Sequence, residues 1–174
     1  MRNEIVLTLT GPDRVGIVEE VTGILLGLQA NVGTSRMARL GGEFAILLDA
    51  SLPAEQAARL EGAFADLESQ GYQVTVRTTS APVRQGGQQV YRVEVSGADH
   101  EGIVYEIAAG LAERGISIDS AETSAVAAPV TGTPLFRMSA VVIVPKGLDE
   151  AEWLASLDEA AAAAGVDVEV TAAE

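Results

Sequence analysis

Apolar residues recur along the start of the chain with two different periods. Ile5, Leu7 and Leu9 alternate with other residues, which is the period of a half-buried strand, and we expect this strand to span residues 3–10 and to end at the turn Gly11-Pro12. From about residue 14 the period changes to that of an amphipathic helix, whose apolar positions are Ile17, Val21, Ile24, Leu25 and Leu28.

The next segments predict two strands, a second helix and a last strand. Strands 32–40 and 43–51 flank Gly41-Gly42, a two-residue hairpin signal that favours an antiparallel pair. Pro53 then marks the start of a helix with Leu60, Phe64 and Leu67 inward, Gly71 marks its end, and residues 72–77 form a strand. The order β-α-β-β-α-β is that of the ferredoxin-like unit.

This pattern occurs twice. Segment 7–21 matches segment 93–107, and Gly, Asp, Gly, Ile, Val and Glu coincide when Gly11 is placed on Gly97. We therefore expect an α+β protein with a first domain at 1–80, a linker at 81–89 and a second domain at 90–174. The second domain is expected to hold a strand at 90–97, a helix at 100–114 ending at Gly115, strands at 117–126 and 135–144 around a loop at 127–134, a helix at 148–164 and a strand at 166–170.

Each predicted unit is a four-stranded sheet with both helices on one face. The other face would be exposed in an isolated copy. Two copies could cover each other's free faces, or join edge to edge into an eight-stranded sheet, and a homodimer would also satisfy this need.

Charge narrows the class of partner. The chain of 174 residues has 11 Lys and Arg against 25 Asp and Glu, a formal net charge of -14. The electrostatic field of so negative a protein repels phosphate backbones and anionic membrane surfaces, so we expect neither direct nucleic-acid binding nor membrane binding. The N-terminus lacks the pattern of a signal peptide, and no apolar run is long enough for a membrane span, which predicts a cytoplasmic protein.

Composition also argues against catalysis and metal binding. The sequence has no Cys and one His, His100, so it offers no thiol nucleophile or thiolate metal site and little for a Ser/His/Asp relay. We expect no catalytic residue, metal or cofactor. His100 is expected to be a surface or cap residue, and Trp153 a packing residue or an interface anchor. Arg36 and Arg39 are expected to face solvent or a partner; a role in clamping a substrate is the alternative, which no second element supports.

The loop between first strand and first helix of each copy carries the strongest chemical signal. Backbone N–H groups at a helix start lack intrahelical partners, and the helix dipole favours a carboxylate there. Gly16 and Gly102 would allow close approach to the backbone, and Asp13 or Asp99 could bind an ammonium group. An amino acid fits this chemistry. The alternative is that each Asp is a helix N-cap and each Gly a packing residue.

The residues of this loop resemble a known family. The segment Thr10–Val18, TGPDRVGIV, is similar to the signature loop of ACT domains, small modules that sense amino acids, and Ala30-Asn31-Val32 resembles their helix-exit turn. The tandem arrangement, with segment 35–44, resembles most closely the glycine cleavage system transcriptional repressor family. The resemblance covers residues 3–79 closely and 90–173 more loosely.

The resemblance implies two ACT-type domains in tandem and a set of ligand-binding positions. ACT ligands lie where the strand-to-helix loop faces a neighbouring domain. The positions so implied are Gly11, Asp13, Arg14, Gly16, Ile17 and Asn31 in the first copy, and Gly97, Asp99, His100, Gly102, Ile103 and Ser117 in the second. The second copy departs from the family pattern at residues 98–101 and at Ser117, so its site is either degenerate or suited to another ligand.

These observations lead to one functional hypothesis and two alternatives. The chain is expected to be a non-catalytic regulator that binds a small amino acid such as glycine at a domain interface. It would signal to a protein partner such as a DNA-binding regulator, since the resemblance implies no DNA-binding domain in the chain itself. The first alternative is a protein–protein interaction scaffold without ligand. The second, an enzyme on a ferredoxin-like fold, lacks a nucleophile and base pair in the repeated loops.

Overall fold

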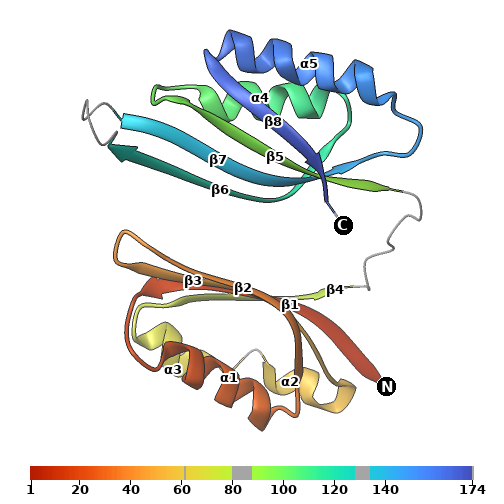
Figure 1. Ribbon diagram of the computed structural model, residues 1–174. Helices are drawn as coiled ribbons and strands as arrows, with labels where there is room; N and C mark the ends of the chain where they lie inside the picture. The colour runs from red at the N-terminus through yellow and green to blue at the C-terminus, as the bar shows by residue number, and fades with distance from the viewer. Residues whose placement is uncertain (61, 80–87, 128–133, 174) are drawn as a thin grey trace. The chain divides into compact units, whose positions relative to one another are not determined.

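The computed structural model describes residues 1–60, 62–79, 88–127 and 134–173. The chain divides into two compact units, Met1–Val83 and Arg84–Glu174, each with its own sheet and helices (Figure 1). Most of the predicted linker lies outside the described residues, and its last residue, Gln89, is the first residue of a strand.

The first unit is a four-stranded antiparallel sheet in the order β2-β3-β1-β4, with its helices on one face (Figure 1). One side of the sheet and the facing side of α1 bury Leu7, Leu48, Val21 and Leu25 at 1% exposure or less. The elements are β1 (Arg2–Pro12), α1 (Ile17–Gly27), β2 (Asn31–Leu40), β3 (Glu43–Pro53), the 3-10 turn η1 (Ala54–Gln56), α2 (Ala57–Leu60), α3 (Ala65–Ser69) and β4 (Gln73–Thr79).

Two expectations for the first unit are wrong in detail. Strand β1 continues through Gly11 and Pro12, which pair with Phe44 and Glu43. At Pro12 the strand has β3 as its neighbour but has already passed the end of its pairing with β4, a position where a proline is tolerated. The single predicted second helix is instead divided into η1, α2 and α3, with turns at Gly62–Phe64, where glycine disfavours helix.

The second unit repeats the sheet in the order β6-β7-β5-β8. Its helices again lie on one face (Figure 1). Of the predicted loop 127–134, residues 128–133 lie outside the described residues, and Ala127 and Pro134 belong to strands. The elements are β5 (Gln89–Ala98), α4 (Ile103–Glu113), β6 (Ser117–Ala127), β7 (Pro134–Val144), α5 (Glu150–Ala163) and β8 (Val166–Ala172).

Helix α5 is continuous and well anchored, unlike its counterpart in the first unit. Asp149 caps it by accepting a hydrogen bond from the Glu152 N–H at 3.0 Å. Trp153, at 1% exposure, packs edge-to-face on Tyr91 with 5.2 Å between ring centroids. The expectation that Trp153 is a packing residue is confirmed.

Glycines end elements where the sequence predicts. Gly71 and Gly115 have positive φ and directly follow the C-cap residues of α3 and α4. Gly41-Gly42 forms the two-residue hairpin turn with φ of 61° and 89°. The α+β class with two ferredoxin-like units is therefore confirmed. No helix among the described residues has the length and apolar character that crossing a bilayer would require.

Candidate functional site: the two strand-to-helix loops

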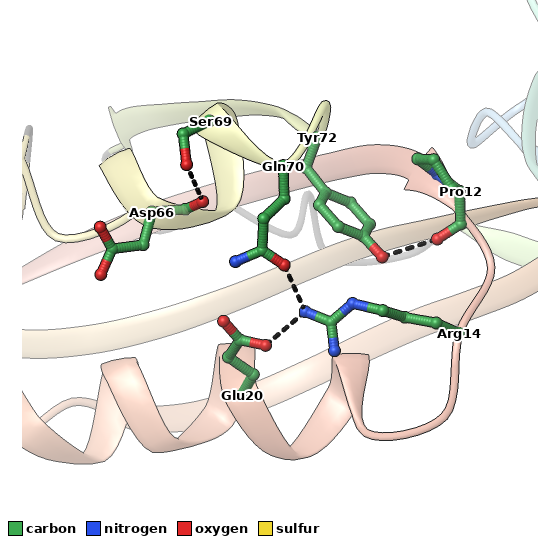
Figure 2. Close-up of polar contacts among 7 residues, drawn as sticks. All are labelled: Pro12, Arg14, Glu20, Asp66, Ser69, Gln70 and Tyr72. Atoms are coloured by element: carbon green, nitrogen blue, oxygen red, sulfur yellow. Dashed lines mark hydrogen bonds and ion pairs between the residues drawn. The ribbon is translucent and has the colours of Figure 1, made fainter.

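Tyr72 fixes the end of β1 in the first copy. Its ring lies over Gly11, where a Cβ would come within 2.5 Å of Tyr72 Cδ1, so Gly11 leaves room for this ring. The phenol hydroxyl donates a hydrogen bond to the carbonyl of Pro12 at 2.6 Å (Figure 2). The end of β1 is therefore held by a hydrogen bond from Tyr72, the residue directly before β4.

Arg14 ties the same loop to two helices. Figure 2 shows its guanidinium between the Glu20 carboxylate and the Gln70 side-chain oxygen, with Gln70 at 3.1 Å. The guanidinium carbon also lies 5.6 Å from the centre of the Tyr72 ring. The hydrogen bond to Glu20, more than any other contact, raises the pKa of Arg14 above its usual value. The guanidinium is thus a charged bridge between α1 and the end of α3.

Asp13 joins the loop to the β2–β3 hairpin. Its N–H donates to the Gly42 carbonyl at 3.0 Å, and its carboxylate accepts a hydrogen bond from Arg39 Nη1 at 3.2 Å. Arg39 was not among the predicted site residues. It lies 26 residues away in sequence, and only the pairing of Pro12 with Glu43 brings the hairpin beside Asp13.

The start of α1 corrects the interpretation of Asp13 as a helix cap. The N-cap is Gly16, in the left-handed conformation with φ of 92° and without a side-chain cap. The Asp13 carboxylate is instead directed to Arg39. The next residue, Ile17, is 3% exposed and its side chain belongs to the core, so it could contribute only its backbone to a ligand.

Asn31 lies at the other end of the sheet from this loop. It begins β2 and pairs with Ser51, whereas Pro12 pairs with Glu43. Eight residues of strand separate these two levels on β3, which is about 26 Å. Within the first unit the structure therefore brings Asp13 and Arg14 together but does not bring Asn31 to them.

The second loop keeps the backbone of the first with other side chains. Gly97 lies against Val166, the Asp99 N–H donates to the Pro134 carbonyl at 3.0 Å, and Gly102 is the left-handed N-cap of α4. Ile103 is 1% exposed and belongs to the core. Ser117 pairs with Ile143 at the far end of the sheet, as Asn31 does with Ser51.

His100 takes the place of Arg14 and caps a helix. Its Nε2 lies 2.7 Å from the carbonyl of Ala164, the C-cap residue of α5, and its Nδ1 lies 2.9 Å from the Glu101 carbonyl. These two carbonyls, Glu101 first, raise the pKa of His100, because only the imidazolium can donate to both. The expected role of His100 as a cap residue is confirmed.

Two hollows of the first unit lie away from the loops. One of about 200 Å³ lies on the sheet at Thr34, Arg36, Leu47 and Asp49. Another, of about 460 Å³, is bounded by α2, α3 and β4. Among the described residues, His, Asp and Glu do not gather in threes where a metal ion could be held. Asp13, Asp99 and His100 are exposed, so both loops are surface sites with charged side chains.

Comparisons with known proteins agree with this architecture. The ACT domain model matches residues 3–79. A crystal structure of an unknown protein from Galdieria sulphuraria is 36% identical, with all of both chains covered and a TM-score of 0.87. No curated protein matches the sequence significantly.

A second solved structure extends the similarity in fold over both units. It is of a protein named provisionally as a glycine cleavage system transcriptional repressor, 22% identical, covering 100% of this chain and 99% of that one with a TM-score of 0.71. At this identity the likeness concerns the fold. With its matching family model, its full-length relative and two ferredoxin-like units, the chain belongs to the ACT domain family as a tandem ACT protein.

Proposed function

We propose that the chain is a non-catalytic regulatory protein of the cytoplasm that binds a small amino acid, glycine or one of similar size. The loop of the first copy carries this proposal. There a carboxylate, Asp13, is held by its backbone beside the start of α1, where Gly16 has no side chain to obstruct a ligand.

The chemistry of the loop suits a zwitterion. Asp13 can accept hydrogen bonds from an ammonium group, and N–H groups in the first turn of α1 can donate to a carboxylate. The dipole of an 11-residue helix favours the negative group at this end. Membership of the ACT family supports an amino acid as the ligand, since these modules sense amino acids.

The signal would pass to a protein partner. The similarity in fold to the provisionally named glycine cleavage repressor supports a transcription regulator as that partner. The formal charge of -14 supports it too, because such a chain is repelled by DNA and would need another protein to contact it. A ligand that prefers one arrangement of domains or subunits would shift the population toward that arrangement.

Thermal unfolding in the presence of each of the twenty amino acids tests the proposal. A ligand at a hundred times its Kd stabilises the folded state by about 2.7 kcal/mol. We expect a small amino acid at millimolar concentration to raise the temperature of thermal unfolding. Asp13→Asn should abolish this rise, and Asp99→Asn should leave it unchanged. If no amino acid moves the transition, the sensor function is wrong and the interaction scaffold becomes the better hypothesis.

A further inference from the structure

The ion pair between Asp13 and Arg39 combines a fixed anion with a movable cation. Asp13 is held at its own N–H by the Gly42 carbonyl, and its side chain is 29% exposed. The Arg39 side chain comes from β2 and is 72% exposed, on a long stem with many rotamers. An exposed pair of this kind contributes little to stability, so it can open at little cost.

An α-amino acid carries the same two charges in the complementary order. Its ammonium group matches the Asp13 carboxylate, and its carboxylate matches the guanidinium, whose paired N–H groups fit two carboxylate oxygens. A ligand inserted between the two side chains would replace their mutual contact by two charge-assisted contacts. Each carboxylate oxygen can accept more than one hydrogen bond, so a two-point contact with Arg39 leaves acceptor sites for the N–H groups of α1.

The second copy retains the anion and lacks the cation at this place. Arg39 pairs with Phe44 on β3, and the residue that pairs with the corresponding Phe136 on β7 is Ala125. Asp99 is present, and the adjoining His100 is engaged with the carbonyls of Glu101 and Ala164. The two-charge arrangement therefore belongs to the first copy.

We propose that Arg39 completes the amino-acid site of the first copy by binding the ligand's carboxylate, and that its ion pair with Asp13 is the resting state of that site. This inference rests on the proposed function. It names the ligand class as a zwitterion with free ammonium and free carboxylate, and it restricts that recognition to the first unit.

Isothermal titration calorimetry with glycine and glycinamide tests the role of Arg39. If another amino acid raises the transition temperature more than glycine does, that amino acid and its amide replace glycine and glycinamide. We expect wild type to bind the acid at least about tenfold more tightly than the amide, because charge-assisted hydrogen bonds are lost with the amide. Arg39→Ala should lower the affinity for the acid by a similar factor and leave the amide unchanged.

Two matched variants separate recognition from structure. Arg39→Lys keeps the charge without the planar fork and should restore part of the preference for the acid. Arg36→Ala removes a positive charge from the same strand but from the opposite face of the sheet, because 36 and 39 are an odd number of residues apart, and should bind as wild type does. Far-UV circular dichroism checks that all three variants are folded.

The outcomes distinguish this inference from the proposed function. If wild type binds an amino acid and Arg39→Ala keeps the full preference for acid over amide, the role of Arg39 is wrong and the sensor function stands. Tighter binding by Arg39→Ala would also overturn it, because Arg39 would then be only a competitor for Asp13. If wild type binds no amino acid, both are wrong.

Discussion

The two copies share a backbone and differ in what holds their loops. In the first copy, charged side chains make the contacts: Arg14 with Glu20 and Gln70, and Asp13 with Arg39. In the second, His100 bonds to main-chain carbonyls, and Val166 replaces Tyr72 against the loop glycine. Exposed charged side chains can exchange partners with a ligand, whereas a ring bound to backbone serves structure. Under the proposed function, this difference favours recognition by the first loop and a structural role for the second.

The helix after the hairpin also differs between the copies, being long in the second and divided in the first. Helix α5 spans 14 residues, has a side-chain cap and buries Trp153, Leu157 and Ala161. The corresponding part of the first copy has helices α2 and α3 of four and five residues. Short helices depend on tertiary packing more than on their own hydrogen bonds, so we expect the first copy to be the more deformable.

Removing the anchor of the second copy should have the largest effect. Trp153→Ala deletes an indole that is 1% exposed and loses the edge-to-face contact with Tyr91, which should lower the free energy of unfolding by about 3–5 kcal/mol. Urea denaturation followed by circular dichroism measures it. Tyr105→Ala removes an aromatic ring that is 72% exposed on α4, and it should change the free energy of unfolding by no more than about 0.5 kcal/mol. Equal losses in the two variants would contradict the assignment of α5 as the anchor.

The loop glycines should respond unequally to an added methyl group. In Gly97→Ala the new Cβ would lie 2.7 Å from Val166 Cγ1 and 3.1 Å from its Cα, and a backbone atom cannot move aside alone. In Gly11→Ala the contacts are all with the Tyr72 ring. We expect each variant to lower the free energy of unfolding by about 1–3 kcal/mol, measured by urea denaturation, with the larger loss in Gly97→Ala. A larger loss in Gly11→Ala would show that the Tyr72 contact is the more rigid.

The cap of α5 offers a smaller change without a counterpart in the first copy. Asp149→Ala removes the hydrogen bond from the Glu152 N–H and should cost about 1 kcal/mol, while Asp149→Asn retains an acceptor and should be nearly neutral. Pro53, the N-cap of η1, makes no such side-chain bond. Trp153 is the single tryptophan of the chain, so its fluorescence reports this transition in the second unit. Unchanged stability in Asp149→Ala would mean that the cap is dispensable.

The smallest effect is expected from His100, and it should depend on pH. The pKa of His100 is raised in the folded state, so its contribution is fully present below the unfolded value of about 6.5 and is lost as pH rises through the folded pKa. The loss of stability in His100→Ala, followed by Trp153 fluorescence, should therefore be greater at pH 5.5 than at pH 8.5. Arg14→Ala, followed by circular dichroism because Arg14 is in the first unit, should lose the same stability at both pH values, because guanidinium keeps its charge throughout. A pH-independent loss in His100→Ala would contradict the imidazolium contact.

Local patterns predicted the elements well where one signal dominated. Gly41-Gly42 predicted its hairpin, and the spacing of Leu60, Phe64 and Leu67 predicted three residues that are all buried. The same spacing failed to predict the interruption of the helix, because burial of these side chains is satisfied by short turns as well as by one helix.

The site was predicted less completely, for a physical reason. The contact of Asp13 with Arg39 depends on sheet register, and that of Arg14 with Gln70 joins residues 56 apart, so no local pattern contains either. The duplication identified both loops. The family resemblance added Asn31, which begins β2 and pairs with Ser51, at the other end of β3 from Glu43. A repeat reveals equivalent positions but not which of them lie close together.

The left-handed glycines before α1 and α4 have a consequence for how such a protein can diverge. Gly16 and Gly102 set the entry into each helix without a side-chain cap, and Asp13 and Asp99 hold their loops through the backbone N–H, so neither role requires the same side chains in both loops. One duplicate could therefore retain Pro-Asp-Arg while the other drifted to Ala-Asp-His within the same backbone. The two glycines thus allow the side chains of the loop to change, and with them the ligand specificity, while the backbone of the fold is kept.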